Sequence, residues 1–170
     1  MQPENVNRRL VKFIWAAMIF FAWALIQGAV IAGGPVRLFI QEGPGTIISA
    51  VHTHIGLMGW LSLALMATIY YQVPIFSGKP IVWPKLIGWI FWILVVCLAA
   101  CSVLMIIAGV IGGQAFADGV KGEELKSIVL PYALPAGILC MISAIAGLMF
   151  VVQILVSLSR GSNASSKLRL

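Results

Sequence analysis

Residues 46–71 read TIISAVHTHIGLMGWLSLALMATIYY and decide the fold, because they form a long apolar run without acids, lysine or arginine. About 25 residues of helix rise roughly 37 Å, which is enough to cross a bilayer. The run contains His52 and His54, the two histidines of the chain. A neutral imidazole below the headgroups loses hydrogen bonds to water, at a cost on the order of a few kcal/mol. The sequence therefore predicts a membrane span whose histidines need a protein partner or a metal.

The composition of the whole chain is that of an integral membrane protein. Of its 170 residues, 61% are hydrophobic and 9% are charged, and the mean hydropathy is +1.05. A chain of this length has room for about four spans, and the apolar runs predict them at residues 10–34, 46–71, 86–110 and 130–158. We predict a single all-α domain, an antiparallel four-helix transmembrane bundle in lipid, with no soluble catalytic domain.

The net charge of +6 indicates membrane topology and not a nucleic-acid partner, once the spans are placed. One side carries the basic residues Arg8, Arg9, Lys12, Lys79, Lys85, Arg160, Lys167 and Arg169. The other side carries Arg37, Lys121 and Lys126 with the acids Glu42, Asp118, Glu123 and Glu124. The positive-inside rule then predicts a multi-pass protein of the inner (cytoplasmic) membrane with both termini inside, so that the histidines lie near the outer surface.

Three features of the connections add detail to this topology. Residues 35–45 form the first outer connection, and residues 118–126 of the second outer connection are compatible with a short interfacial helix. Tyr70, Tyr71 and Trp83 are typical of an aromatic belt at the inner surface.

The two histidines point in different directions on an α-helix. His52 shares a face with Gly56, Gly59 and Leu63, whereas His54 lies about 200° away. They therefore cannot both ligate one haem from a single chain. The glycines leave a smooth surface beside His52, which suits either a flat macrocycle or a neighbouring helix.

A haem b would use this arrangement through three groups. His52 would bind the iron, the tetrapyrrole would lie against Gly56 and Gly59, and Arg37 would pair with a propionate. The alternative is that His52 bonds a backbone carbonyl or Gln27 while the glycines serve helix packing. In that alternative Arg37 is an interfacial anchor, and His54 makes an interhelical hydrogen bond.

Sulfur-containing side chains form a second pattern. Cys97, Cys101 and Met105 follow at four-residue intervals and share a helix face, which most often means packing. With His52 and His54 they would also suit Cu(I), so copper is the alternative cofactor. All three cysteines, Cys140 included, lie in apolar runs, and no disulfide framework is expected.

The segment HTHIGLMGWLSLALMATIYYQVP resembles the second transmembrane helix of the catalytic subunits of haem-copper oxidases and nitric oxide reductases. The resemblance extends over about residues 10–75. It implies that a histidine near the outer end of this helix is an axial ligand of a low-spin haem. The spacing to Tyr70, Tyr71 and Pro74 favours His52 as that ligand, whereas the spacing to Trp60 favours His54. The small stand-alone four-span relatives carry a similar H-x-H motif before a Gly-Trp pair, here Gly59 and Trp60.

The departure from this family limits the function that it implies. The family's catalytic site needs several further histidines, and the chain has only two. It is therefore no oxidase or reductase by itself. We expect a b-type haem protein that carries electrons near the outer surface, or an accessory subunit of a respiratory complex. The sixth ligand would be His52 of a second copy in a homo-oligomer, Met105 or Met141, or the position would stay open for a diatomic gas.

A cofactor-free structural or assembly subunit is the remaining alternative. It would pack against partner helices through small residues, namely Gly109, Gly113, Gly137 and Gly147.

Overall fold

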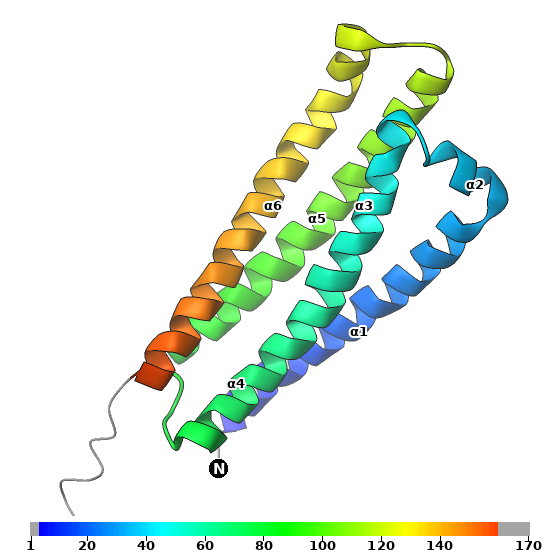
Figure 1. Cartoon of the computed structure of the whole chain (residues 1–170). Helices are drawn as coiled ribbons and strands as arrows, with labels where there is room; N and C mark the ends of the chain where they lie inside the picture. Colours follow the sequence, from blue (N-terminus) through cyan, green and yellow to red (C-terminus); the bar gives the residue numbers. More distant parts are fainter. Residues whose placement is uncertain (1–3, 160–170) are drawn as a thin grey trace, which may run out of the picture.

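The computed structural model describes residues 4–159, and it describes the side chains from Arg8 onward. Its elements are α1 (Glu4–Ala32), α2 (Gly34–Phe39), the 3-10 turn η1 (Gly43–Gly45), α3 (Thr46–His54), the π-helix η2 (Ile55–Ser62), α4 (Leu63–Ser77), α5 (Pro84–Ala117) and α6 (Gly122–Ser159). The elements α3, η2 and α4 follow one another without a break and form one long rod (Figure 1). The predicted antiparallel all-α bundle is therefore confirmed.

Four stretches of helix are long and apolar enough to cross a membrane: Arg8–Ala32, Gly43–Ser77, Pro84–Ala117 and Gly122–Ser159. The protein is thus a multi-pass membrane protein. The last two stretches have 34 and 38 residues, or about 51 and 57 Å of helix, and so exceed the roughly 30 Å of bilayer hydrocarbon. The helical segment expected at residues 118–126 is no separate helix, because α6 already begins at Gly122. Gly119 and Gly122, with φ of +90° and +66°, allow the reversal between α5 and α6.

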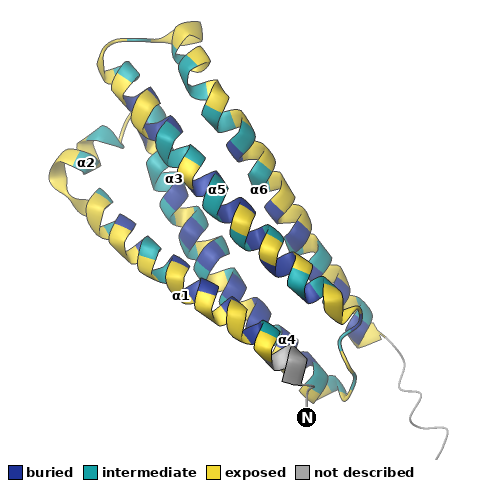
Figure 2. Ribbon diagram, turned by 180° about the vertical axis from the view of Figure 1, so that it is seen from behind, coloured by how far each residue is buried: buried dark blue, intermediate teal, exposed yellow. Residues whose placement is uncertain are grey.

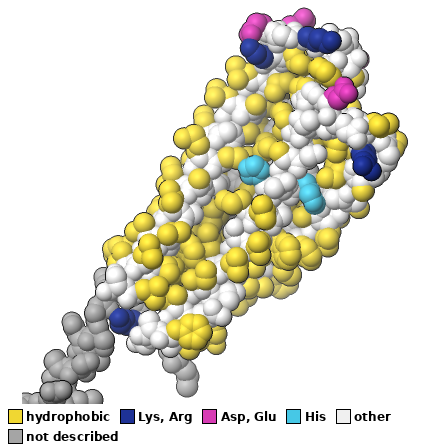
Figure 3. All heavy atoms as spheres, viewed as in Figure 1, with side chains coloured by type: hydrophobic (Ala, Val, Ile, Leu, Met, Phe, Trp, Pro, Cys, Tyr) yellow, Lys and Arg dark blue, Asp and Glu magenta, His cyan; other side chains and the backbone are white. Residues whose placement is uncertain are grey.

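The bundle has two ends with different charges. One end, here called the α2 end, carries α2 and the turn between α5 and α6; the other, the α4–α5 end, carries the start of α1 and the connection between α4 and α5 (Figure 1). Acidic and basic side chains mix at the α2 end (Figure 3). At the α4–α5 end Arg9 donates to the carbonyl of Pro84 over 2.6 Å. Arg160, Lys167 and Arg169 lie outside the described residues.

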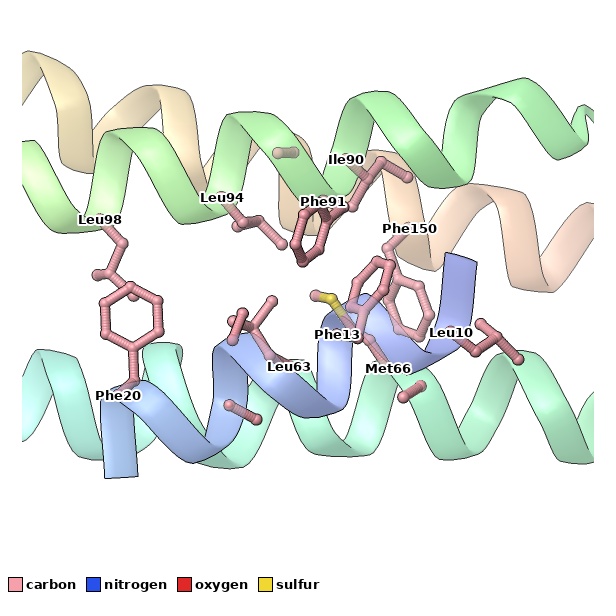
Figure 4. Packing of buried hydrophobic residues seen from close by; sticks show 14 of the residues in the cluster. Leu10, Phe13, Phe20, Leu63, Met66, Ile90, Phe91, Leu94, Leu98 and Phe150 are labelled. Atoms are coloured by element: carbon pink, nitrogen blue, oxygen red, sulfur yellow. The ribbon is translucent and has the colours of Figure 1, made fainter. Parts of the chain in front are cut away.

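The core lies mainly in the half of the bundle near the α4–α5 end. Four aromatic rings, from Phe13, Tyr70, Phe91 and Phe150, meet there, with ring centroids 4.9 Å apart for Phe13–Phe91 and 5.1 Å for Tyr70–Phe150. Figure 4 shows the rings of Phe13, Phe91 and Phe150. Buried residues follow the facing sides of the helices, and exposed residues lie on the outside (Figure 2). Many of these exposed residues are large and apolar. Lipid would be the natural solvent of that outer surface.

A fully buried amide, Gln153 of α6, joins three segments at this end. Its oxygen accepts from the Tyr70 hydroxyl over 2.7 Å, and its nitrogen donates to the carbonyls of Val82 and Trp83 over 2.7 and 3.1 Å. Tyr70 is therefore not the aromatic-belt residue that the sequence indicates, because its ring is buried and its hydroxyl is used inside the bundle. Tyr71 and Trp83 are both 53% exposed, as a belt requires.

Two consecutive residues of the π-helix η2, Gly59 and Trp60, pack against α1. A side chain at Gly59 would collide with Phe20, whose Cγ lies 2.7 Å from the position of an added Cβ. Trp60 stacks on Phe21 with ring centroids 4.2 Å apart. The Gly-Trp pair of the sequence therefore packs the histidine helix against the first span.

Two of the four glycines assigned to partner packing are used within the chain. Gly109 faces Ile48, and Gly113 faces Phe39. Gly137 and Gly147 of α6 have no atom of the chain within 4 Å of an added Cβ. Only these two therefore remain available to lipid or to another helix.

Candidate functional site

A pocket opens at the α2 end, where α1 and α3 diverge and α2 crosses between them (Figure 1). Its volume is about 490 Å³, within the range of small-molecule and cofactor sites. It is lined by Gly28, Ile31 and Ala32 of α1, Arg37 of α2, Ile40 and Gln41 of the following turn, and Ser49 and His52 of α3. The structure thus brings together His52 and Arg37, which are 15 positions apart in the sequence.

His52 lies half-buried against α1. Its Cε1 would be 3.0 Å, and its Nε2 3.6 Å, from a Cβ added to Gly28. The absence of a side chain at Gly28 is therefore what gives the imidazole its place. Among the described residues His52 makes no hydrogen bond, and its Nδ1 is buried without a partner. An unpaired imidazole in an apolar span is the situation that a metal would relieve.

Gln27 supplies a second buried atom without a partner at the same interface. Its amide nitrogen donates to the carbonyl of Ile48, one helical turn before His52, over 3.3 Å. Its Oε1 is buried and unpaired, and so is His52 Nδ1. An amide oxygen accepts and an Nδ1–H donates, so the two atoms are chemically complementary. The sequence-based alternative of a His52–Gln27 hydrogen bond is not formed in this structure.

Arg37 is exposed at the pocket and is the cation nearest in sequence to the histidines. Among the side chains described from residue 8 to residue 159 it has no carboxylate partner, whereas Lys126 at the same end pairs with Glu123 over 2.6 Å. A planar guanidinium without a partner suits an anionic group such as a carboxylate.

His54 lies elsewhere and has a partner. Its Nδ1 is 3.0 Å from the carbonyl of Ala50, one turn earlier on the same helix, and it does not line the His52 pocket. The two imidazoles are separate at the molecular surface (Figure 3). The predicted divergence of the two histidines is therefore seen, and the interhelical hydrogen bond expected for His54 is an intrahelical one.

The glycines expected beside His52 are arranged differently. Gly59 is buried under Phe20, and Gly56 has no chain atom within 4 Å of an added Cβ. Gly59 faces α1, as His52 does, but Phe20 covers it, so it leaves no open surface beside the imidazole. The glycine that does contact His52 is Gly28, which the sequence reading missed. Its signal is a glycine next to the polar Gln27 near the end of the first span.

The side chains of Cys101, Met105 and Cys140 meet between α5 and α6, and not at the His52 pocket. Cys101 Sγ lies 2.7 Å from Cys140 Sγ and 3.6 Å from Met105 Sδ. Neither Met105 nor Met141 lines the His52 pocket, and Met141 is 68% exposed. Residues 4–159 contain no group of three or more His, Cys, Asp and Glu side chains that could hold a metal ion. A copper site made from both histidines and these sulfur residues is therefore not assembled here.

Comparison with known proteins gives no assignment: no family model matches the chain, and no curated protein matches it.

Proposed function

We propose that this protein binds haem b in the pocket between α1, α2 and α3, with His52 as an axial ligand through Nε2. The observation that carries the proposal is that His52, whose ring has no hydrogen bond among the described residues, lines the same pocket as Arg37, which has no carboxylate partner among them. The first suits iron, and the second suits a propionate. The pocket volume of about 490 Å³ and its mostly apolar lining also fit a cofactor.

Each residue has a definite part in this proposal. His52 donates its lone pair from Nε2, Gly28 leaves room for the ring, and Arg37 holds the anionic edge of the cofactor at the water surface. Gln27 Oε1, the other buried atom without a partner at this interface, is the acceptor that we assign to Nδ1–H; that bond would fix the tautomer and raise the basicity of the ligand. The haem itself would supply one-electron redox chemistry.

The proposed role is electron transfer or accessory function in a respiratory complex, at the outer surface of the inner membrane. The haem-copper resemblance of the second span and the excess of basic residues at the α4–α5 end support it. Within residues 4–159, no methionine and no second histidine lines the pocket. A sixth ligand would therefore come from another copy, or the position would stay free for a diatomic gas.

The absorption spectrum of protein purified from haem-replete cells tests the proposal. We expect a Soret band that is lost in His52→Ala and kept in His54→Ala, since His54 is bonded to its own helix and is the matched control. Both variants should remain folded and monodisperse in detergent. A colourless wild-type protein, or a Soret band unchanged by His52→Ala, would refute the assignment of His52.

A further inference from the structure

The two helices α5 and α6 bring a pair of thiols together, away from the His52 pocket. Cys101 Sγ and Cys140 Sγ lie 2.7 Å apart, and the two residues are 39 positions apart in the sequence. Met105 Sδ packs on Cys101 at 3.6 Å. Both cysteines lie near the middle of their helices, Pro84–Ala117 and Gly122–Ser159. The pair therefore lies deep in the bilayer, between two helices that share a long interface.

The two sulfur atoms are in direct contact, at 2.7 Å, and they belong to facing helices. A disulfide, with its S–S distance of about 2.05 Å, can therefore form between them without a rearrangement of the bundle. A soft metal ion between two thiolates would need the sulfur atoms to move apart, because metal–sulfur bonds of about 2.3 Å hold them farther apart than this.

The surroundings also favour a disulfide over a bound cation. Cys101 is 1% exposed, and no third His, Cys, Asp or Glu joins the pair to form a metal site within residues 4–159. Burying thiolate charge in hydrocarbon is costly, whereas a disulfide is neutral and apolar. The position in the span also shields the pair from the aqueous thiols that keep cytosolic cysteines reduced.

Access is from the lipid side. Cys140 of α6 is half-buried and so partly reachable from the outer surface of the bundle, whereas Cys101 of α5 is buried. A lipid-soluble oxidant can therefore approach the pair where a water-soluble one cannot. Membrane quinones belong to that chemical class.

We propose that Cys101 and Cys140 form a disulfide between α5 and α6, with a membrane quinone as the two-electron acceptor. Both S–H bonds break and one S–S bond forms, while two electrons and two protons pass to the quinone and give the quinol. The bond links the two helices at mid-membrane once oxidised quinone has reached the pair. It is independent of haem binding at His52.

Thiol counting on the intact protein tests this proposal. The purified chain, reduced and then held without oxygen in lipid nanodiscs, is incubated with a fully substituted ubiquinone analogue, which cannot add thiols to its ring. It is then denatured, alkylated and weighed. We expect three alkyl groups before quinone, one afterwards on Cys97, and three again after dithiothreitol, with one quinol formed per chain.

Two serine variants serve as controls for the pairing. Cys97→Ser should lose both remaining alkylation sites on quinone treatment, whereas Cys140→Ser should keep two sites with and without quinone. Three alkyl groups on the quinone-treated wild type would overturn the proposal. It would equally be overturned if the thiols were protected by a stoichiometric metal that a chelator releases without a reductant, which would indicate a soft-metal site.

Discussion

His52 shows how one residue depends on a neighbour from another helix. Its ring is accommodated because Gly28 has no side chain, and its buried Nδ1 has no partner. An added Cβ at Gly28 would come within 3.0 Å of the imidazole, whereas one at Gly56 would meet no chain atom within 4 Å. Substitutions at these two glycines therefore distinguish two possible positions for a haem. One is the pocket between α1 and α3, and the other is the surface beside Gly56.

We predict that Gly28→Leu lowers the haem content of the purified protein and that Gly56→Leu does not. Overpacking costs about 1–3 kcal/mol, so haem affinity should fall by about 10-fold or more in Gly28→Leu. The haem-to-protein ratio of each purified variant measures the effect, and thermal unfolding in detergent checks that both remain folded. The reverse result would place the haem on the Gly56 face that the helical periodicity predicts.

Among the elements, η2 and the connection between α4 and α5 depart most from regular helix geometry. In the π-helix Gly59 lies against Phe20, and the side-chain hydroxyl of Ser62 donates to the carbonyl of Leu57, five residues earlier, over 2.8 Å. Gln153 holds the connection in place. Its side-chain oxygen accepts from Tyr70, and its nitrogen donates to the carbonyls of Val82 and Trp83. These bonds fix the position of α4 relative to α6.

We predict that Gln153→Leu destabilises the bundle. It removes the acceptor of the Tyr70 hydroxyl and the donor to the carbonyls of Val82 and Trp83, at a cost of about 1–3 kcal/mol for each group that stays dry. Gln114→Leu is the matched control, because Gln114 is exposed and bonds only Asp118, over 3.2 Å; its effect should stay within about 0.5 kcal/mol. Thermal unfolding in detergent compares them. Equal unfolding temperatures for the two variants would show that the Gln153 bonds contribute little.

The molecule as a whole consists of two helix pairs with different chemistry. The pair made by α1 and the α3–η2–α4 rod holds the His52 pocket, and the pair made by α5 and α6 holds the thiols. The aromatic core near the α4–α5 end joins the two pairs. A membrane orientation follows from the charges at the two ends, because basic residues concentrate at the α4–α5 end.

We predict that this end is cytoplasmic. Alkaline phosphatase fused after residue 120, in the turn between α5 and α6, should be active because it is exported, whereas the same enzyme fused after residue 170 should be inactive. A fluorescent protein that folds only inside the cell should give the opposite pattern. If the phosphatase were active only after residue 170, the His52 pocket would face the cytoplasm and the proposed site of electron exchange would be on the wrong side.

The sequence by itself determined the all-α membrane class, the approximate spans and the separation of charges between the two ends. It could do so because hydrocarbon accepts only long apolar helices whose backbone is internally bonded. It also singled out His52, since polar groups are costly in such a span, and Arg37 as the cation nearest to it in the sequence. Only the tertiary structure decided which side chains meet. Gly28 beside His52, Phe20 over Gly59 and Cys140 against Cys101 depend on how helices distant in sequence pack, and the π-helix breaks the 3.6-residue periodicity on which sequence reasoning rests.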